Sequence, residues 1–484
     1  MIILQKYLGG FMGQKKKIIV LILLALTQFL VVLDSSIVNV ALPAIKESLG
    51  FTDASLQWIL TAYVLTFGGF LLLGGRAADL FGRRKVLLTG LIGFTATSLL
   101  IGLSQSSESF IVLRALQGLT AAFMSPAAMS VLLTTFSEGP ERNRALSVWS
   151  IVASGGAAAG VLLGGVLTQL FGWHWDFFVN VPFGILAAIG IYKYVPAHIK
   201  EESDKNLDIP GALLITTGLI ALVYSISQAP ELGILDASVV VTFVASILLI
   251  IAFVYNESKV KHPLVPLSVF RLRNVVGGNL IMIPAMAGML GMFFFMSLYM
   301  QNILKFTPIE SGLAFAPFPV ILGFISWHAP KLVKRFGIKK LLIVGTLLPT
   351  IGISLLTALP LNGSYIVNIL PSIILIPAGM SVFFLSAILA ATSGVPARES
   401  GLVSGLINTS QQIGGALGVA LLAGVAAFAA GGVQSPEAQL QGYHAAFAAS
   451  AVLMVGALLV AVFVIKVPKK DSNSSVDEAV VTSH

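Results

Sequence analysis

The chain has 484 residues, of which 56% are hydrophobic and only 10% charged, with a net charge of +8 and no cysteine. Ordinary soluble domains carry about 25% charged residues, so this composition argues against a soluble protein and indicates a polytopic membrane protein. The lack of cysteine excludes disulfides, thiol catalysis and cysteine-bound metal.

Fourteen apolar runs are long enough to cross about 30 Å of hydrocarbon, which takes roughly 20 helical residues. Lipid offers no water to backbone groups, and the alternation typical of barrel strands is absent, so we predict an all-α protein. In chain order the predicted spans are 18–40, 55–75, 85–104, 109–133, 144–170, 177–195, 209–228, 236–255, 275–302, 310–328, 340–360, 365–390, 400–428 and 443–466.

The Lys and Arg residues alternate with these spans. Counted against fourteen helices, 26 of the 29 basic residues fall on the side of the two termini. The positive-inside rule therefore predicts cytoplasmic termini and a multi-pass protein of the cytoplasmic membrane. The excess of basic residues reflects the orientation of the chain in the membrane, so no nucleic-acid partner is expected. Residues 1–17 form the predicted cytoplasmic N-terminus without a cleavable signal, and the tail 469–484 is expected to be disordered.

Two loops on the cytoplasmic side resemble each other. The stretches ADLFGRRKVL (Ala78–Leu87) and VKRFGIKKLL (Val333–Leu342) both place Phe-Gly ahead of basic and then apolar residues. Such an internal repeat between the two halves of a chain is expected for transporters built from repeated bundles. We therefore predict an N-terminal bundle over 18–200, two inserted helices over 205–256 and a C-terminal bundle over 270–468.

Two charged residues lie well inside the predicted spans, Asp34 and Arg114. At 1.5 Å per residue, Asp34 lies about 24 Å from the cytoplasmic start of its span, and Arg114 about 6 Å from the outer start of its own. Both are then about 6 Å below the outer edge of the hydrocarbon, which predicts an ion pair. In a membrane such a pair marks a proton or substrate path; a static bridge between helices is the alternative.

Five stretches carry further motifs along the chain. They are LDSSIVNVALP in span 1, GGRAADLFGRRKVL in loop 2–3, RALQGLTAA in span 4, GWHWDFFVNVPFGIL before span 6 and GLVSGLINTSQQIGGALGVALL in span 13. Together they resemble the fourteen-span drug:proton antiporter family of the major facilitator superfamily. The resemblance covers nearly the whole chain. It implies the major facilitator fold with 14 transmembrane helices, arranged as two six-helix bundles plus two inserted helices.

The resemblance also implies roles for individual residues. Arg114 occupies the position of the span-4 arginine that the family uses in proton coupling, and its predicted partner Asp34 would carry the proton. The carboxylate of Asp79 is placed to cap a neighbouring helix N-terminus and to pair with Arg83 or Arg84; ordinary charge pairing and topology are the alternative to a latch. The loop motif implies a conformational latch formed by Gly75, Asp79, Gly82, Arg83 and Arg84.

Span 5 carries Gly156, Gly160 and Gly164 at intervals of four residues, followed by Gly165. Glycine at this interval makes a smooth stripe that lets another helix approach closely. The stripe predicts either plain packing or a sliding contact between the bundles. The family's antiporter motif has proline where this chain has Val161, a departure that weakens the expectation of antiport.

Four residues are candidates for a substrate cavity: Asn39, Gln117, Met289 and Phe293. Gln117 shares a helix face with Arg114, one turn away. Asn39 is polar within a span, and hydrogen bonds between helices are its alternative role. Met and Phe repack easily, so GMLGMFFFMSLY (Gly288–Tyr299) predicts an adaptable apolar wall or, alternatively, bulk that faces lipid.

Together these features predict a secondary active transporter of the multidrug efflux type. It would be a proton-coupled antiporter that exports small amphipathic compounds by alternating access, with protons and membrane lipid as further partners and no cofactor or metal. The alternatives are a facilitator or symporter of a specific metabolite or lipid, a non-transporting membrane sensor, or a membrane-embedded enzyme. No HExxH motif and no nucleotide-binding loop occurs, which argues against an enzyme. With a single deep acidic residue, we expect neutral or singly charged substrates in preference to dications.

Overall fold

The computed structural model describes residues 13–137, 139–196, 207–393, 395, 400–431, 433 and 435–465, and these residues form helices and turns without a strand. The predicted tail and most of the predicted N-terminal segment lie outside the described residues. The long helices are α2 (Gln14–Leu49), α4 (Trp58–Phe81), α5 (Arg83–Gly102), α6 (Ser107–Thr135), α7 (Pro140–Phe171), α9 (Asn180–Tyr194), α10 (Ile209–Leu232), α11 (Ala237–Lys259), α12 (Arg273–Leu298), α14 (Pro317–Phe336), α15 (Ile338–Leu355), α16 (Leu370–Thr392), α17 (Ser400–Ala430) and α18 (Pro436–Leu459). The shorter elements are α3 (Asp53–Leu56), α8 (Trp175–Phe178), α13 (Pro308–Phe315), η1 (Leu267–Arg271), η2 (Tyr299–Ile303), η3 (Leu356–Ala358), η4 (Tyr365–Ile369) and η5 (Val460–Val464).

Each of the fourteen predicted spans corresponds to a described helix or a pair of consecutive helices. Among the described residues, thirteen segments are long and apolar enough to cross a membrane, and the apolar part of α7 supplies the remaining span. Most helices extend beyond the predicted limits because polar caps and glycines set their ends. Ser106 caps α6 by accepting from the Ser109 N–H, and Thr307 and Glu310 form a capping box at α13.

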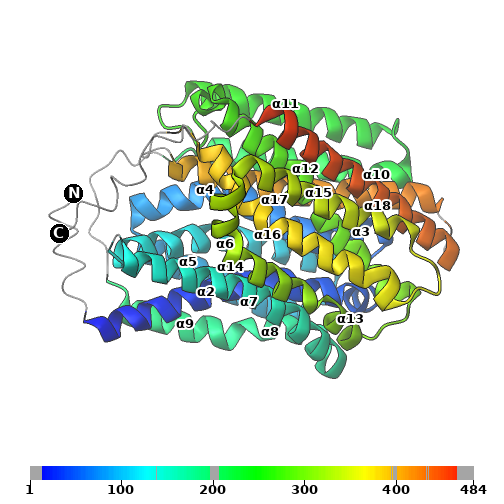
Figure 1. Ribbon diagram of the computed structural model, residues 1–484, viewed down its shortest axis with the longest axis horizontal. Helices are drawn as coiled ribbons and strands as arrows, with labels where there is room; N and C mark the ends of the chain where they lie inside the picture. Colours follow the sequence, from blue (N-terminus) through cyan, green and yellow to red (C-terminus); the bar gives the residue numbers. More distant parts are fainter. Residues whose placement is uncertain are drawn as a thin grey trace.

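The two halves of the chain repeat the same helix contacts (Figure 1). In the first half α2 packs against α6, α7 and α9, α4 packs against α6, and α5 packs against α6 and α9. In the second half α12 packs against α16, α17 and α18, α14 against α16, and α15 against α16 and α18. This correspondence describes two six-helix bundles with equivalent helices in equivalent places.

The repeat extends to the backbone of the two similar loops. Gly82 lies between α4 and α5 with φ of 97°, and Gly337 lies between α14 and α15 with φ of 84°. Glycine adopts this left-handed backbone readily because it has no Cβ. The Phe-Gly pair therefore makes the same tight helix-to-helix turn in both halves.

The bundles meet through two equivalent pairs of contacts. Helix α4 packs against α17, and α7 packs against α13 and α14. Helix α10 contacts both α4 and α17, whereas α11 packs chiefly against α10 and lies along the upper edge of the molecule in Figure 1. Of the candidate spans, α11 is the least buried, so the inserted helices flank the seam between the bundles.

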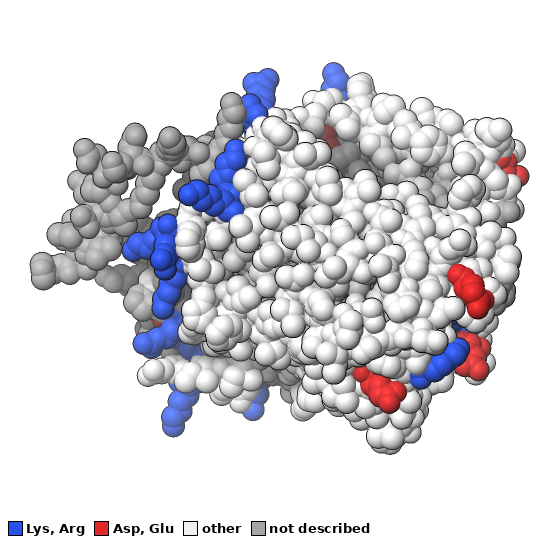
Figure 2. Space-filling view, turned by 45° about the vertical axis from the view of Figure 1, so that its right-hand side comes forward, with Lys and Arg blue, Asp and Glu red and all other residues white. Residues whose placement is uncertain are grey.

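Charge is distributed unevenly over the surface. Figure 2 shows Lys and Arg gathered at the left-hand end, where α2 begins, and mostly carboxylates at the opposite end, with a wide uncharged surface between them. An uncharged belt between polar ends is the surface that a hydrocarbon core requires. The chain is a multi-pass membrane protein.

Candidate functional site

A buried ion pair joins α2 and α6. Nη1 of Arg114 lies 2.6 Å from Oδ2 of Asp34, and the two side chains are 1% and 0% exposed. The two residues that the sequence places at matching depth are therefore in direct contact. A charge in such a place is tolerated only when it is paired and hydrogen-bonded.

Further hydrogen bonds satisfy both charged groups. Oδ1 of Asp34 accepts from Nε2 of Gln117 at 2.8 Å and from Nδ2 of Asn180 at 3.2 Å. Arg114 donates through Nε to the carbonyl of Ile59 at 3.0 Å and through Nη1 to Oε1 of Gln117 at 2.6 Å. The site thus ties together α2, α4, α6 and α9 around a pair with no net charge.

Two more side chains complete the surroundings of the ion pair. Ser98 accepts a hydrogen bond from Gln117 at 2.9 Å, and the Arg114 guanidinium lies 4.5 Å from the centre of the Tyr63 ring. A cation over an aromatic face is stabilised by the ring quadrupole. Gln117 therefore belongs to the ion-pair site and is fully buried there. Asn180 lies within the stretch GWHWDFFVNVPFGIL, whereas Ser98 and Tyr63 lie in none of the five sequence motifs.

The loop-motif residues form a basic cluster at the end where α4 meets α5. Asp79 pairs with Arg83 at 3.2 Å, one of the two partners expected for it. Arg84 instead donates to the backbone carbonyl of Tyr192, over whose ring it lies. Gly75 faces the side chain of Pro126, so a Cβ there would only touch it.

Arg76, which the sequence did not single out, connects this loop to a distant segment. Its Nη1 donates to the carbonyl of His262 at 2.7 Å. His262 belongs to the segment that leads from α11 to α12. The contact links the first bundle to the approach of the second, which is the kind of connection that a conformational latch requires.

The glycine stripe of α7 packs against α2 and not against the second bundle. The backbone or side chains of α2 lie within 3.4 Å of a Cβ built at Gly156, Gly160 or Gly164. The expectation of a sliding contact between bundles is therefore wrong for these three glycines. Gly165 does face the second half, since its Cβ would lie 2.6 Å from the carbonyl oxygen of Pro308.

At the other end of the same helix pair, Lys17 and Glu141 form an ion pair of 2.8 Å. The hydrogen bond from Lys17 lowers the pKa of the Glu141 carboxyl. Helices α2 and α7 are thus held together along their length, and the close part of the contact lies beside Asp34.

Replacing Gly160 by alanine is expected to destabilise the protein. The new Cβ would lie 2.0 Å from Oγ of Ser36 and 2.9 Å from the backbone oxygen of Leu33, so the two helices must separate. Overpacking of this kind costs about 1–3 kcal/mol. Thermal unfolding in detergent should show a lower transition temperature. Gly155→Ala is the matched control, because nothing lies within 4 Å of that position; equal losses in both variants would contradict the interpretation.

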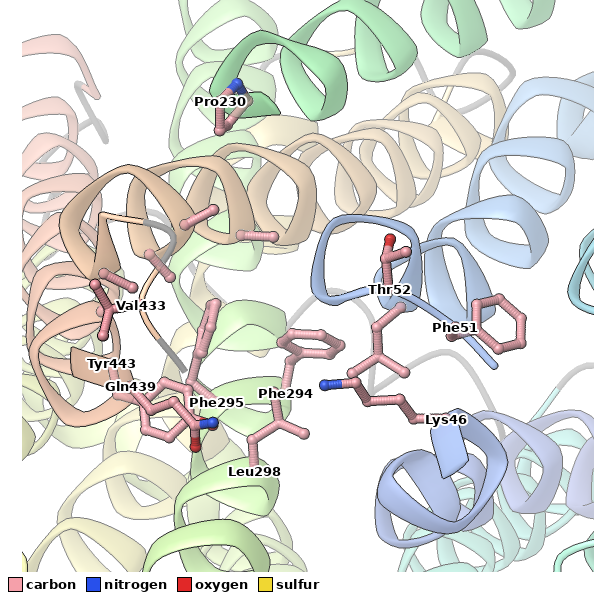
Figure 3. A pocket seen from close by; sticks show the side chains of 16 residues that line it. Lys46, Phe51, Thr52, Pro230, Phe294, Phe295, Leu298, Val433, Gln439 and Tyr443 are labelled. Atoms are coloured by element: carbon pink, nitrogen blue, oxygen red, sulfur yellow. The ribbon is translucent and has the colours of Figure 1, made fainter. Parts of the chain in front are cut away.

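A cavity of about 730 Å³ lies near the end of α2, between the bundles and α10. Figure 3 shows the rings of Phe294 and Phe295 on one side and the Lys46 ammonium pointing into the space from the other. None of the described residues that line it is acidic. The lining consists of Lys46, Phe51, Thr52, Leu56, Pro230, Phe294, Phe295, Leu298, Ala423, Ala426, Ala427, Ala430, Val433, Gln439, Gly442 and Tyr443.

The candidate cavity residues lie elsewhere. Asn39 donates its side-chain amide to the Ser35 carbonyl at 3.0 Å, a hydrogen bond within its own helix and not between helices. Met289 is buried in the core, and Phe293 packs against Phe318 with ring centres 4.7 Å apart. Phe294 and Phe295, from the same segment, line the cavity described above.

The described residues bring together no group of three His, Asp or Glu side chains that could hold a metal ion. The Asp34–Arg114 ion pair offers one kind of chemistry, the binding and release of a proton. A proton on Asp34 would remove the negative charge that Arg114 faces, so the charge of the carboxyl and the position of the arginine are linked.

Comparison with known proteins shows which family and which fold the chain resembles. The profile of the Major Facilitator Superfamily matches residues 24–419. A puromycin resistance protein of Streptomyces alboniger is 38% identical over 91% of this chain and 88% of its own length. A cephamycin export protein of Amycolatopsis lactamdurans is 38% identical over 90% of each chain. Among solved structures, an auto-inhibited POT family peptide transporter superposes with a TM-score of 0.69 at 17% identity, over 95% of this chain and 99% of its own, which supports the fold alone.

Proposed function

The chain belongs to the Major Facilitator Superfamily, and from this premise we propose that it exports small amphipathic compounds by proton-coupled antiport. It is a transporter and not an enzyme. Relatives that match nine-tenths of the chain are named for drug resistance or export, which supports a multidrug efflux type of activity. The substrate class and the coupling to protons are the parts that need a test.

The observation that carries the proposal is the buried Asp34–Arg114 pair. Taking up a proton on Asp34 leaves Arg114 buried without its counterion, which is unfavourable unless the two residues move apart. Protonation is thereby linked to a rearrangement of α2 and α6. A proton bound in one conformation and released in another is what coupling to a gradient requires.

Helix α2 connects the ion pair to the interface between the bundles. Beyond Asp34, its backbone accepts hydrogen bonds from α12 and the following turn η2: Ser297 donates to the Asn39 carbonyl at 2.5 Å, and Gln301 donates to the Val40 carbonyl at 2.9 Å. A movement of one bundle against the other must break or shift these bonds. The charge of Asp34 and the relative position of the bundles are therefore mechanically linked.

The cavity supports an apolar substrate with at most one positive charge. Aromatic and alanine side chains dominate its lining, and burial of apolar surface contributes roughly 25 cal/mol per Å². The ammonium of Lys46 points into it, and none of the described lining residues supplies a carboxylate. A dication placed there would lack compensating charge.

A vesicle assay tests the function. The purified protein is reconstituted in liposomes with an acidic interior, and uptake of a monovalent and a divalent fluorescent dye is followed together with internal pH. We expect gradient-driven uptake of the monovalent dye with loss of protons from the lumen. Equal transport after the gradient is collapsed would indicate a facilitator, and dye movement in the direction of the protons would indicate a symporter.

We propose that the end rich in Lys and Arg faces the cytoplasm, as the positive-inside rule indicates. Single cysteines in this cysteine-free chain test the orientation. Lys85→Cys places the thiol in the exposed first turn of α5, and Leu235→Cys places it at the opposite end, where residue 235 is 91% exposed. An impermeant maleimide added to intact cells should label only Leu235→Cys. Labelling of Lys85→Cys alone would reverse the orientation.

A further inference from the structure

A second carboxylate, Asp176, is buried close to the ion pair. It lies in the short helix α8 and is 0% exposed. Its Oδ2 accepts a hydrogen bond from Oγ1 of Thr168 at 2.6 Å, while Oδ1 is buried without a hydrogen-bond partner among the described residues. The sequence placed Asp176 just before span 6, near the membrane boundary, and so did not count it among the buried charges.

The surroundings of Asp176 differ from those of Asp34. Asp34 has an arginine and two amide donors, whereas the described residues give Asp176 one hydroxyl donor and no ion pair. A carboxylate that is removed from water and lacks a counterion is strongly destabilised, so such a group keeps its proton. Asp34 therefore has the environment of an ionised carboxylate, and Asp176 that of a carboxylic acid.

The charged groups around Asp176 do not change this assignment. The helices packed against α8 are α2, α5, α7 and α9. Of these, α2 contributes Asp34, which repels a second negative charge, while α5, α7 and α9 carry their Lys, Arg and Glu residues at the opposite end. Arg114, from α6, is paired with Asp34. Partial burial lowers the pKa of His174, which keeps that ring neutral.

Asn180 lies one helical turn after Asp176, a spacing that places both side chains on one face. Its Nδ2 donates to Asp34, and its Oδ1 is buried with no hydrogen-bond partner in the described part of the chain. Two acceptor oxygens without a donor thus lie along one face, next to the ion pair. A proton on Asp176 supplies the missing donor, because a carboxylic acid donates one hydrogen bond.

We propose that Asp176 is a second proton-binding residue, which holds a proton while Asp34 is paired with Arg114. It directly follows the exposed residue Trp175, at the end of the molecule opposite the basic cluster. When Arg114 leaves Asp34 and becomes the counterion of Asp176, the O–H bond of Asp176 breaks and an O–H bond forms on Asp34. The total charge of the site is unchanged, since the negative charge passes to Asp176. This inference rests on the proposed antiport.

Infrared difference spectroscopy of the purified protein tests the protonation of Asp176 without reference to transport. Asp176→Asn should remove one carbonyl band of a protonated carboxylic acid at neutral pH. Thr168→Val, which keeps the acid but removes its hydroxyl donor, should move that band to higher frequency, and it serves equally if Asp176→Asn does not fold. Glu108→Gln, an exposed carboxylate on α6, is the control and should leave the band in place. A band unaffected by the first two variants would overturn the proposal.

Transport in vesicles tests the role of the proton. Asp176→Asn should slow gradient-driven transport at least tenfold. It should also shift how the transport rate depends on the pH of the compartment on the α8 side of the membrane, while dye binding stays unchanged. If the wild-type protein couples to protons and the Asp176→Asn variant has the same pH profile, the role of Asp176 is contradicted and the proposed function is not. Wild-type protein without coupling would instead contradict the proposed function, and the infrared result would still decide whether Asp176 holds a proton.

Discussion

Asp34→Asn is expected to abolish proton-driven transport while the folded protein stays in the membrane. Asparagine has nearly the same shape as aspartate, and its amide oxygen can still accept a hydrogen bond from Arg114. It cannot take up or release a proton, so the link between the gradient and the movement of α2 is lost. Dye uptake in vesicles with an imposed pH gradient should fall to the level of protein-free liposomes.

Energy-independent exchange separates a loss of coupling from a loss of folding. Exchange of labelled for unlabelled substrate across the vesicle membrane needs binding and alternating access, and Asp34→Asn should retain it. Glu108→Gln removes an exposed carboxylate near the same end of the molecule and should transport like the wild type. Undiminished gradient-driven uptake by Asp34→Asn would refute its role as proton carrier.

Arg114→Ala is expected to cause the largest loss of stability of any single change at this site. The substitution leaves Asp34 buried without a counterion and the Ile59 carbonyl without its donor. Removing one partner of a buried ion pair costs about 3–5 kcal/mol. The amount of folded protein recovered from membranes and its melting temperature in detergent should both fall sharply, and coupling should be lost.

A double substitution distinguishes the orphaned charge from lost packing. Combining Asp34→Asn with Arg114→Gln removes both charges and keeps groups that can hydrogen-bond. Folded protein should return towards the wild-type amount, whereas gradient-driven transport should not. If Arg114→Ala melts at the wild-type temperature, the ion pair contributes nothing to stability and its retention must be explained by function alone.

The Asp34–Arg114 contact could be predicted from the sequence because hydrocarbon leaves a buried charge few options. Each residue of a helix adds a known rise, so the depth of a charge follows from its distance to the end of its span. Opposite charges at equal depth in a medium without water then pair. The fourteen spans followed for a similar reason, since transfer into lipid depends on composition more than on neighbours.

The rotation of each helix and the identity of its neighbours were not predictable in this way. The glycine stripe of α7 predicted a close partner, but only the packed structure showed that α2 is that partner beside Gly160. Phe293 and Phe294 are adjacent and equally apolar, yet Phe293 packs against Phe318 whereas Phe294 lines the cavity. Hydropathy does not determine which face of a helix turns towards which neighbour.

Asp176 shows the same limit for a charged residue. Its place next to a predicted span end put it in the boundary region, where a carboxylate meets water at little cost. Burial came from α2, α5, α7 and α9, which close around α8. The membrane-crossing segments and the pairing of the two deep charges could thus be predicted from the amino-acid sequence, because both depend on transfer from water to hydrocarbon. The polar groups that share one dry site could be identified only once the helices were packed, because the site forms where helices distant in the chain meet.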